Sequence, residues 1–409
     1  MKQNNFSLKT ELLKPSKKFI EKQLNPEITI LIPSLNEELT ISKFIDWCWE
    51  GIQKSGVRGE IIIIDSSSDK TPFLALKKGA YVLRTPQRGL GQAYIDAIPF
   101  VNGKFVILGD CDLTYDFRKI DLFVKKYRAN YDFVMGSRYK GAIEKKSMPF
   151  LHQYFGTPVT TFILNIIYNS NFSDIHCGMR GLTKKAFYKI DLTSPGWEYA
   201  SEMIIKAKRQ GLKICEVPVY FYKDIKGRES HHKRSGFLSP WIAGWDNLRV
   251  MFVYAADYFF IKPSLLLMLL GAIISALSYN KKFVFLNVKL NTHSFVIGLI
   301  LISLGLTLFQ FGKISQHIHK LNSRSDTKNK LWPLSYNKKM LISLMLISIS
   351  IVNAMVFFLE YKNNGYNLFK NSHFFIMSLF GIFYGLLITT FNILGELIRI
   401  ELPYNKRSK

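Results

Sequence analysis

Residues 27–260 alternate short apolar runs with longer amphipathic stretches. Five of the runs are rich in isoleucine and valine and nearly uninterrupted by polar residues, which is typical of strands covered on both faces. We predict these strands at residues 28–33, 60–65, 81–84, 105–110 and 132–136. The amphipathic stretches between them predict helices at residues 39–54, 70–78, 91–100 and 118–128. Strands and helices that alternate at this spacing predict an α/β domain built on a mostly parallel sheet.

The remainder of the chain is dominated by four long runs that carry no charged residue. These runs cover residues 263–280, 290–312, 340–359 and 371–395. A bilayer core of ~30 Å needs about 20 predominantly apolar residues as helix, and each run approaches or exceeds that length. Helices buried in a soluble bundle are the alternative, which four such runs in succession disfavour. We therefore predict an all-α, four-helix transmembrane region at residues 261–400.

Lysine and arginine are distributed unevenly around the four apolar runs. Seven lie between the second and third runs, whereas three follow the first run, two follow the third and four follow the last. The positive-inside rule then predicts a multi-pass protein of the cell (inner) membrane whose α/β domain and basic tail, residues 401–409, are cytoplasmic. Residues 1–26 are polar and lysine-rich without the apolar core of a signal peptide, and we expect a polar extension there.

Composition narrows the classes of protein that fit this pattern. The 409 residues include 55 Lys+Arg against 30 Asp+Glu, a formal charge of +25, yet 48% are hydrophobic. That apolar content excludes intrinsic disorder, and four scattered cysteines exclude a disulfide scaffold. The charge alone would suit a nucleic-acid binder. Because much of it lies where the positive-inside rule requires it, we expect no nucleic-acid partner.

Polar residues follow the predicted strands, at the edge of a parallel sheet where ligands bind. The second strand ends in Asp65, and the fourth ends in Asp110, with Asp112 two residues later. Two carboxylates at this spacing can hold one hard divalent cation, which can neutralise a diphosphate. The fifth strand is followed by Arg138, whose planar guanidinium suits a phosphate. These residues predict a site for a phosphorylated ligand and a cation.

The order and spacing of these segments resemble the family-2 inverting glycosyltransferases of GT-A fold, and most of all the polyprenyl-phosphate glycosyltransferases of the dolichol-phosphate mannose synthase type. Residues 173–180 and 197–203 resemble acceptor-side segments of that group, so the resemblance covers roughly residues 27–260. It implies a GT-A domain at residues 27–235, a nucleotide-sugar donor, a polyprenyl-phosphate acceptor at the membrane, and Mg²⁺ or Mn²⁺ as cofactor.

The resemblance also implies roles for individual residues. Asp110 and Asp112 would bind the metal. The donor side would be formed by Pro33, Asn36, Glu37, Asp65, Arg88, Gly89, Gly91 and Asp110. The chain departs from the family pattern at Ile64, where a second acid is common, and at Thr114, where a glutamine often adds a metal ligand.

Three residues are candidates for the chemical step itself. Arg138 and Arg180 would lie on phosphates, and Asp174 would act as a base or as an orienting carboxylate. Asp174 could instead cap a turn, the commoner use of an aspartate in a Ser-Asp pair. A lipid phosphate is already ionised near pH 7 and needs less help from a base than a sugar hydroxyl does.

Acceptor-side candidates lie in the second half of the domain. Glu198 and Glu202 are one helical turn apart and share a face, which either contacts the acceptor or is solvated or salt-bridged. Arg234 belongs to a polar loop that either closes over the phosphates or is simply solvated.

A helix at residues 236–260 connects the two regions of the chain. Trp241, Trp245, Leu248 and Phe252 recur at helical spacing on one of its faces, which predicts a helix in the membrane interface. The alternative is a helix packed on the catalytic domain, and both descriptions can hold together.

The leading hypothesis is a membrane-anchored enzyme that moves a hexose from a GDP- or UDP-linked donor to a polyprenyl phosphate on the cytoplasmic leaflet. A processive polysaccharide synthase is an alternative, although the chain lacks the Gln-x-x-Arg-Trp string of that group. A lipid-linked-sugar transport or partner module with a degenerate transferase domain is another, which the intact Asp110 and Asp112 disfavour. The sugar, the nucleotide, the polyprenol and a homo-oligomeric state are left open by the sequence.

Overall fold

The computed structural model describes residues 10–86, 89–225, 227–228, 239–255, 257–279, 284–285, 288–321, 335–363 and 372–407. It divides into two compact units, Met1–Val253 and Tyr254–Lys409, which are described separately below.

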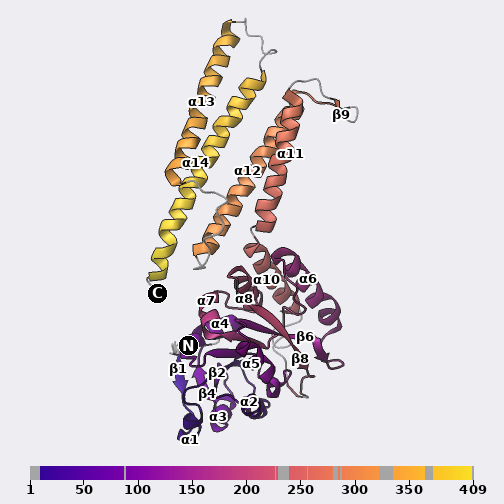
Figure 1. Cartoon of the computed structure of the whole chain (residues 1–409), viewed down its shortest axis with the longest axis vertical. Coiled ribbons are helices and arrows are strands. Elements are labelled where there is room, and N and C mark those ends of the chain that lie inside the picture. The colour runs from indigo at the N-terminus through magenta and orange to yellow at the C-terminus, as the bar shows by residue number, and fades with distance from the viewer. Residues whose placement is uncertain are drawn as a thin grey trace, which may run out of the picture. The chain divides into compact units, whose positions relative to one another are not determined.

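The first unit is built on an eight-stranded sheet with the strand order β1-β4-β3-β2-β5-β7-β6-β8 (Figure 1). Strands β2, β3, β4 and β5 pair in parallel, β7 runs antiparallel between β5 and β6, and β8 pairs parallel with β6. The strands are β1 (Glu11–Leu13), β2 (Ile28–Ser34), β3 (Gly59–Asp65), β4 (Tyr81–Arg84), β5 (Phe105–Leu108), β6 (Phe133–Ile143), β7 (Arg180–Thr183) and β8 (Ile214–Phe221). All five predicted strands and the mostly parallel sheet are confirmed.

Helices cover both faces of this sheet (Figure 1). One group comprises α2 (Ile41–Ser55), α3 (Thr71–Lys77) and α5 (Asp121–Arg128), and the other comprises α4 (Leu90–Ala97), α7 (Lys184–Ile190) and α8 (Tyr199–Arg209). The remaining helices of this unit are α1 (Lys17–Lys22), α6 (Thr157–Tyr168) and α10 (Ser239–Tyr254), with the short 3₁₀-helices η1 (Ile98–Phe100) and η2 (Phe117–Lys119) and the π-helical segment η3 (His152–Gly156). The four predicted helices correspond to α2, α3, α4 with η1, and α5.

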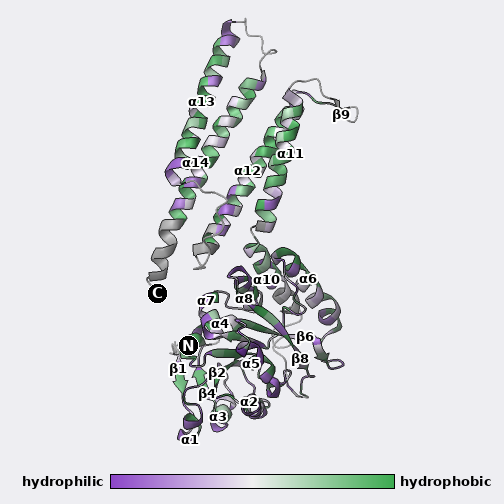
Figure 2. Cartoon of the chain, in the orientation of Figure 1, coloured by the Kyte–Doolittle hydropathy of each residue, from purple (hydrophilic) through white to green (hydrophobic). Residues whose placement is uncertain are grey.

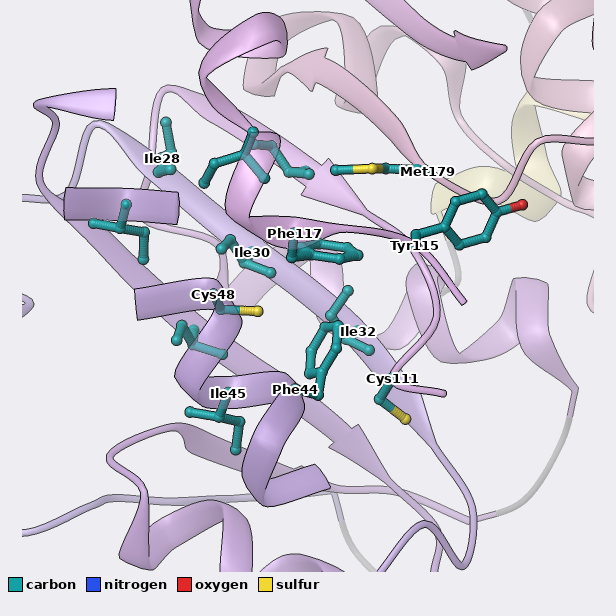
Figure 3. Close-up of a cluster of buried hydrophobic side chains, with 14 of the residues drawn as sticks. Ile28, Ile30, Ile32, Phe44, Ile45, Cys48, Cys111, Tyr115, Phe117 and Met179 are labelled. Carbon is teal, nitrogen blue, oxygen red and sulfur yellow. The ribbon is translucent and has the colours of Figure 1, made fainter. Parts of the chain in front are cut away.

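The core explains why these strands are continuously apolar. Ile28, Ile30 and Ile32 lie along one face of β2 and pack against the α2 side chains Phe44 and Cys48, all fully buried (Figure 3). The alternate residues of β2 meet the helices on the other face, so neither face of the strand contacts water. The burial fixes the strand register, and with it the position of every residue that follows a strand end.

The second unit consists mainly of long apolar helices (Figure 2). They are α11 (Lys262–Tyr279), α12 (Thr292–Leu321), α13 (Tyr336–Asn363) and α14 (Ser372–Arg407), with η4 (Asp257–Ile261) before the first and the short strands β9 (Val284–Phe285) and β10 (Val288–Lys289) after it. Small residues permit close packing, since a side chain at Gly271 in α11 would lie 2.5 Å from the carbonyl of Gly298 in α12.

Four stretches of this unit are long and apolar enough to cross a membrane: Tyr258–Tyr279, Thr292–Gln316, Tyr336–Asn363 and His373–Ile398. Each overlaps one of the four predicted spans. The first begins before Lys262, so this lysine lies inside an apolar helix, where its long side chain can extend toward the interface.

Candidate active site

Two carboxylates lie just beyond the end of β5. An oxygen of Asp112 accepts hydrogen bonds from the backbone and the hydroxyl of Thr114, at 3.0 and 2.6 Å, which fix its orientation. Desolvation by the surrounding protein and the charge of Asp112 raise the pKa of Asp110 to about 7. The positive charges of Arg228 and Arg138 act to lower the pKa of Asp110, whereas the negative charge of Glu37 acts to raise it further. Residues from four separate segments therefore form one electrostatic site.

The surroundings of Asp110 suit a small divalent cation. A side chain at Gly178 would lie 2.5 Å from an Asp110 oxygen, so the glycine keeps one side of this carboxylate open. Among the described residues, no cluster of three or more His, Cys, Asp or Glu gathers in a way that could enclose a metal. Mg²⁺ typically takes one or two carboxylates and completes its shell with water and substrate phosphates. Asp110 and Asp112 fit that pattern, whereas the Thr114 hydroxyl is already donated to Asp112.

Arg228 supplies a positive charge at the same place. It forms a two-pronged ion pair with Glu37, at 2.7 and 2.6 Å, and a further bond of 2.7 Å to Asp224. Its guanidinium lies 3.5 Å from the second oxygen of Asp112. Burial works against the charged form, but the bonds to Glu37 and the charge of Asp112 raise the pKa of Arg228 above its ordinary value. The arginine therefore occupies the space beside the carboxylates to which a cation would also be attracted.

The loops after β2 and β3 are bonded to each other. The Asn36 amide N–H donates to the Ser67 hydroxyl at 2.7 Å, and the Asn36 side chain accepts from the Ser68 backbone at 2.9 Å. Asn36 adopts the left-handed conformation, φ 54°, which asparagine tolerates better than most residues. Pro33 precedes this loop at the end of β2, and its carbonyl accepts the Cys111 thiol at 3.5 Å. The predicted donor-side loop is therefore rigidly tied to its neighbours.

Asp65 ends β3, next to these two loops. It is fully buried, accepts hydrogen bonds from Ser34 and Ser67 at 2.8 and 2.6 Å, and forms an ion pair with Arg84. Arg84 is its direct partner in the β3–β4 register and also donates to the Ser67 carbonyl. Asp65 is thus neutralised inside the domain, and Arg84 is the partly exposed member of the pair.

The glycine turn before α4 packs against residues 193–196. Gly89 has a φ of 114°, and a side chain there would lie 2.3 Å from the Pro195 carbonyl. A side chain at Gly91 would lie 2.1 Å from the Ser194 carbonyl. Glu202 holds this segment in place, because its buried carboxylate accepts hydrogen bonds from the backbone N–H groups of Thr193 and Ser194 at 3.0 and 2.8 Å.

The two acceptor-side glutamates are thus placed in different environments. Glu202 is fully buried and also pairs with Lys206 at 2.5 Å, so the structure does not bring it to an open acceptor surface. Glu198 precedes α8 and accepts the Gly196 N–H at 3.1 Å. Both carboxylates support the segment next to the glycine turn. The remaining predicted site residues, Arg88 and Arg234, lie outside the described residues.

Arg138 and Asp174 form the second charged centre of the site. Two guanidinium nitrogens of Arg138 donate to the two Asp174 oxygens at 2.7 and 2.8 Å, and the Arg138 backbone N–H adds a bond of 3.1 Å. Asp174 is fully buried, and Glu216 on β8 holds its loop by accepting the Ser173 backbone N–H at 2.8 Å. Asp174 and Arg138 thus form a buried, two-pronged ion pair that fixes the orientation of the guanidinium.

Arg180 has a different environment from the one expected. It is fully buried, and its guanidinium donates to the carbonyl oxygens of Cys177, Ala200 and Ile175 at 2.9, 2.7 and 2.8 Å. The structure does not bring it to the open edge of the site, where a phosphate contact was expected. Its donors instead join the loop after Asp174 to α8.

Comparison with known proteins identifies the family. The model of the family described as "Glycosyl transferase family 2" matches residues 29–191, from β2 to the end of α7. The low-salt glycan biosynthesis hexosyltransferase Agl6 of Haloferax volcanii is 34% identical over 298 residues, which are 72% of this chain and 70% of that protein. The chain belongs to glycosyltransferase family 2. It is therefore a glycosyltransferase with a GT-A-type α/β domain, as predicted.

Other similarities of this family-2 enzyme are more distant. The dolichyl-phosphate hexose transferase of Haloferax volcanii is 28% identical over 197 residues, 47% of this chain and 82% of that protein. Among solved structures, mannosyl-3-phosphoglycerate synthase from Rubrobacter xylanophilus is 18% identical with a TM-score of 0.44, over 58% of this chain and 77% of that one.

Sequence reasoning missed three charged residues of this family-2 site. Arg84 is the last residue of a predicted strand, and that strand pairs with the strand that ends at Asp65. The order of the strands in the sheet could therefore have indicated the contact between the two residues. Arg228 lies in the polar loop that the sequence singled out, but its partner Glu37 is 191 residues away. Glu216 lies on β8, which was not predicted, and gave no signal of its own.

Proposed function

We propose that this family-2 enzyme transfers a hexose from a nucleotide-sugar to a polyprenyl phosphate, with a divalent cation bound at Asp110 and Asp112. The observation that carries the proposal is the cluster of opposite charges after the strand ends, where Arg228 pairs with Glu37 at 2.7 and 2.6 Å and lies 3.5 Å from Asp112. Asp110 lies within electrostatic reach of Arg228 and of Arg138. Two carboxylates for a cation and two arginines for phosphates match a reaction in which both the donor and the acceptor are phosphorylated.

The proposed reaction is a displacement at the anomeric carbon. An oxygen of the acceptor phosphate forms a bond to this carbon, while the bond to the donor diphosphate breaks and its electron pair remains on the diphosphate. A divalent cation bound at this site would neutralise the leaving diphosphate. Arg138, oriented by Asp174, stabilises negative charge on the phosphates, and the held loops after β2 and β3 position the nucleotide.

Such a mechanism needs no strong general base, because a phosphate monoester is already ionised near neutral pH. This agrees with the surroundings of Asp174, whose two oxygens are bonded to Arg138. The carboxylate is therefore assigned to holding Arg138 in place. A sugar hydroxyl as acceptor would require a carboxylate with an oxygen directed at the substrate.

The lipid nature of the acceptor is supported by the rest of the chain and by its relatives. Four helices long and apolar enough to cross a membrane follow the catalytic unit. One relative is named a hexosyltransferase of glycan biosynthesis, and another is named a dolichyl-phosphate hexose transferase. The lysine and arginine distribution favours a cytoplasmic catalytic unit, so the acceptor phosphate would lie in the cytoplasmic leaflet.

The test is transfer by the purified full-length chain in bilayers. Radiolabelled GDP- and UDP-hexoses are offered in turn with Mn²⁺ and either polyprenyl phosphate, the corresponding polyprenol, or 3-phosphoglycerate. The proposal expects label in a mild-acid-labile lipid with polyprenyl phosphate alone. Equal labelling of the polyprenol, or transfer to the soluble acceptor without lipid labelling, would contradict the lipid-phosphate assignment.

A further inference from the structure

Helix α13 carries an exposed amide side chain on a mainly hydrophobic surface (Figure 2). Asn353 lies inside the uncharged run of residues 340–359, and its neighbours Val352 and Met355 are 57% and 63% exposed. Among the residues that the structure describes, the Asn353 amide has no hydrogen-bond partner. In a bilayer this amide would face hydrocarbon, where a polar group without a partner is costly.

Amide side chains inside the neighbouring candidate spans are placed differently. Gln310 in α12 and Asn392 in α14 are only 8% and 6% exposed, and Asn392 donates to the Tyr336 carbonyl at 3.2 Å. Polar residues within membrane helices normally face the interior of the bundle, as these two do. Asn353 departs from this arrangement, which indicates that a single copy of the chain does not complete its surroundings.

Helix α14 covers another side of α13, and the two helices lie side by side (Figure 1). The Ser343 hydroxyl accepts the Thr389 hydroxyl at 2.9 Å, and a side chain at Gly381 would collide with the Ser350 hydroxyl, so both serines face α14. In the candidate span formed by α13, 11% of the most apolar stretch is buried, compared with 39% in the span of α12. Much of the surface of α13 is therefore open to a partner.

This open surface carries a regular stripe, called here the α13 seam. Its members follow one another at intervals of four and three residues: Ile342, Leu346, Ile349, Asn353 and Val356. Ile342, Ile349 and Val356 are 46%, 56% and 50% exposed. The pattern repeats every seven residues, which is typical of helices that pack along one another over several turns. A single asparagine in such a seam can fix which residues pair and how many helices associate.

We propose that the α13 seam is a contact between two copies of this chain, in which the two Asn353 amides hydrogen-bond to each other. Two copies in one membrane share a topology, so their α13 helices run parallel and Asn353 lies at the same depth in both. An amide side chain both donates and accepts, so identical amides across a two-fold axis satisfy each other. Ile349 and Val356 would pack against their counterparts on either side of this pair.

A second copy fits the seam better than a different membrane protein does. An unrelated helix would have to present a polar group at the depth of Asn353, whereas a second copy has one there by symmetry. The seam carries no charged residue, so nothing in it selects a partner of opposite charge. The contact lies within the second unit and goes beyond the proposed function, since it does not rest on the identity of the sugar or of the acceptor.

The test is disulfide cross-linking between copies of the full-length chain in bilayers. Three of the four cysteines are buried, so a Cys215→Ser background leaves few reactive thiols. Ile349→Cys and Val356→Cys each place a thiol on the seam. The variants are oxidised with copper phenanthroline at a large excess of lipid, and the dimers are quantified by denaturing electrophoresis without reductant.

Ile351→Cys and Phe358→Cys are the matched controls. Each lies two residues beyond a seam position, at nearly the same depth but about 160° around the helix. Both side chains are open to a label or a thiol partner, since Ile351 is 41% and Phe358 is 62% exposed. Cross-linked dimers are expected at the two seam positions and not at these controls.

The contribution of the amide is measured in the Ile349→Cys chain. Asn353→Leu should lower the dimer yield about threefold or more, as expected for loss of a hydrogen bond between membrane helices. Asn353→Gln keeps an amide and should retain most of the yield. Ser348→Leu also replaces an exposed polar residue of α13, away from the seam, and should leave the yield unchanged. Circular dichroism checks that each variant is folded.

Three results would overturn the proposal. Equal cross-linking at seam and control positions would show random collision, and an unchanged yield in Asn353→Leu would show that the amides do not pair. Dimers at none of the positions would leave the seam to lipid or to a different protein. Hexose transfer is not measured in any arm, so failure of the dimer and failure of the proposed function are told apart.

Discussion

Arg228 and Glu37, 191 residues apart in sequence, form a two-pronged ion pair at the carboxyl ends of the strands. The same guanidinium lies 3.5 Å from Asp112, one of the two carboxylates assigned to the cation. A positive side chain and a divalent cation at this position compete for the same negative charge. We therefore expect a cation bound at the proposed site to weaken the hold of these carboxylates on Arg228.

Replacement of Arg228 by alanine is expected to tighten cation binding in the absence of nucleotide. Removal of a competing charge should raise the affinity for Mn²⁺ by about fivefold or more, a typical size for coupling between two charged sites. Free Mn²⁺ measured by electron paramagnetic resonance during titration gives the affinity directly. Arg118→Ala is the matched control, because Arg118 forms a comparable pair with Asp116. Unchanged Mn²⁺ affinity in Arg228→Ala would show that no competition exists.

Asp174→Asn is expected to lower kcat much more than it raises the KM for donor. The variant keeps the size of the side chain but loses the charge that orients Arg138, and misplacement of a catalytic group by about 1 Å can cost about 100-fold. Arg138→Lys should show a similar loss, because an ammonium group cannot form the two-pronged bond. Steady-state kinetics at saturating polyprenyl phosphate separate the two parameters. Full activity in Asp174→Asn would exclude an orienting role.

Gly91→Ala is expected to weaken donor binding without affecting acceptor binding. The added methyl group would lie 2.1 Å from the Ser194 carbonyl, so the glycine turn must move away from the segment held by Glu202. Overpacking of this kind costs about 1–3 kcal/mol. Donor affinity by calorimetry should fall, whereas Gly244→Ala, where nothing lies within 4 Å, should leave it unchanged. Equal donor affinity in both variants would show that the glycine turn is not part of the donor site.

His176 predicts a specific loss of stability in mild acid. Burial lowers its pKa from 6.5 to about 4, so between these values the unfolded chain binds a proton that the folded chain does not. Stability that depends on neutral His176 is present above pH 6.5 and falls as the pH drops toward 4. Thermal unfolding of His176→Gln should lose less stability than the wild type over this window. His293→Gln, in the second unit, should follow the wild type, and parallel curves for His176→Gln would contradict the assignment.

The sequence was sufficient for those parts of the fold that depend on local pattern. Strands β2, β3 and β5 are buried on both faces, so their apolar runs were unmistakable, and Asp65, Asp110 and Asp112 followed from their ends. Strand β7 was not predicted, because its four residues include Arg180 and a glycine. Strand β8 was not predicted either, because Glu216 and Pro218 in its middle interrupt the apolar run that would indicate a strand.

Residues whose role depends on distant partners could not be assigned in advance. Arg180 has the chemistry of a phosphate ligand, but three backbone carbonyls from two segments bury it. Glu202 was predicted to share an exposed or acceptor-facing helix face with Glu198, but it is buried because its carboxylate binds Thr193 and Ser194 in the segment before α8. The direction in which α6 faces could not be predicted either: Phe155 and Phe162 are exposed, and a hydrophobic period fixes a stripe but not the side of the helix that is buried.

The measurement that tests the central claim most directly is hexose transfer by the purified chain with and without the Asp112 carboxylate. Wild-type protein and Asp112→Asn are reconstituted in the same bilayers with polyprenyl phosphate, Mn²⁺ and the donor that the wild type accepts, and the lipid product is quantified by mass spectrometry. The account predicts a polyprenyl-phosphate hexose from the wild type and a loss of about 100-fold or more in the variant, since the charge that binds the cation and the leaving diphosphate is removed. An undiminished yield of that lipid from Asp112→Asn, or none from the wild type with any donor, would contradict it.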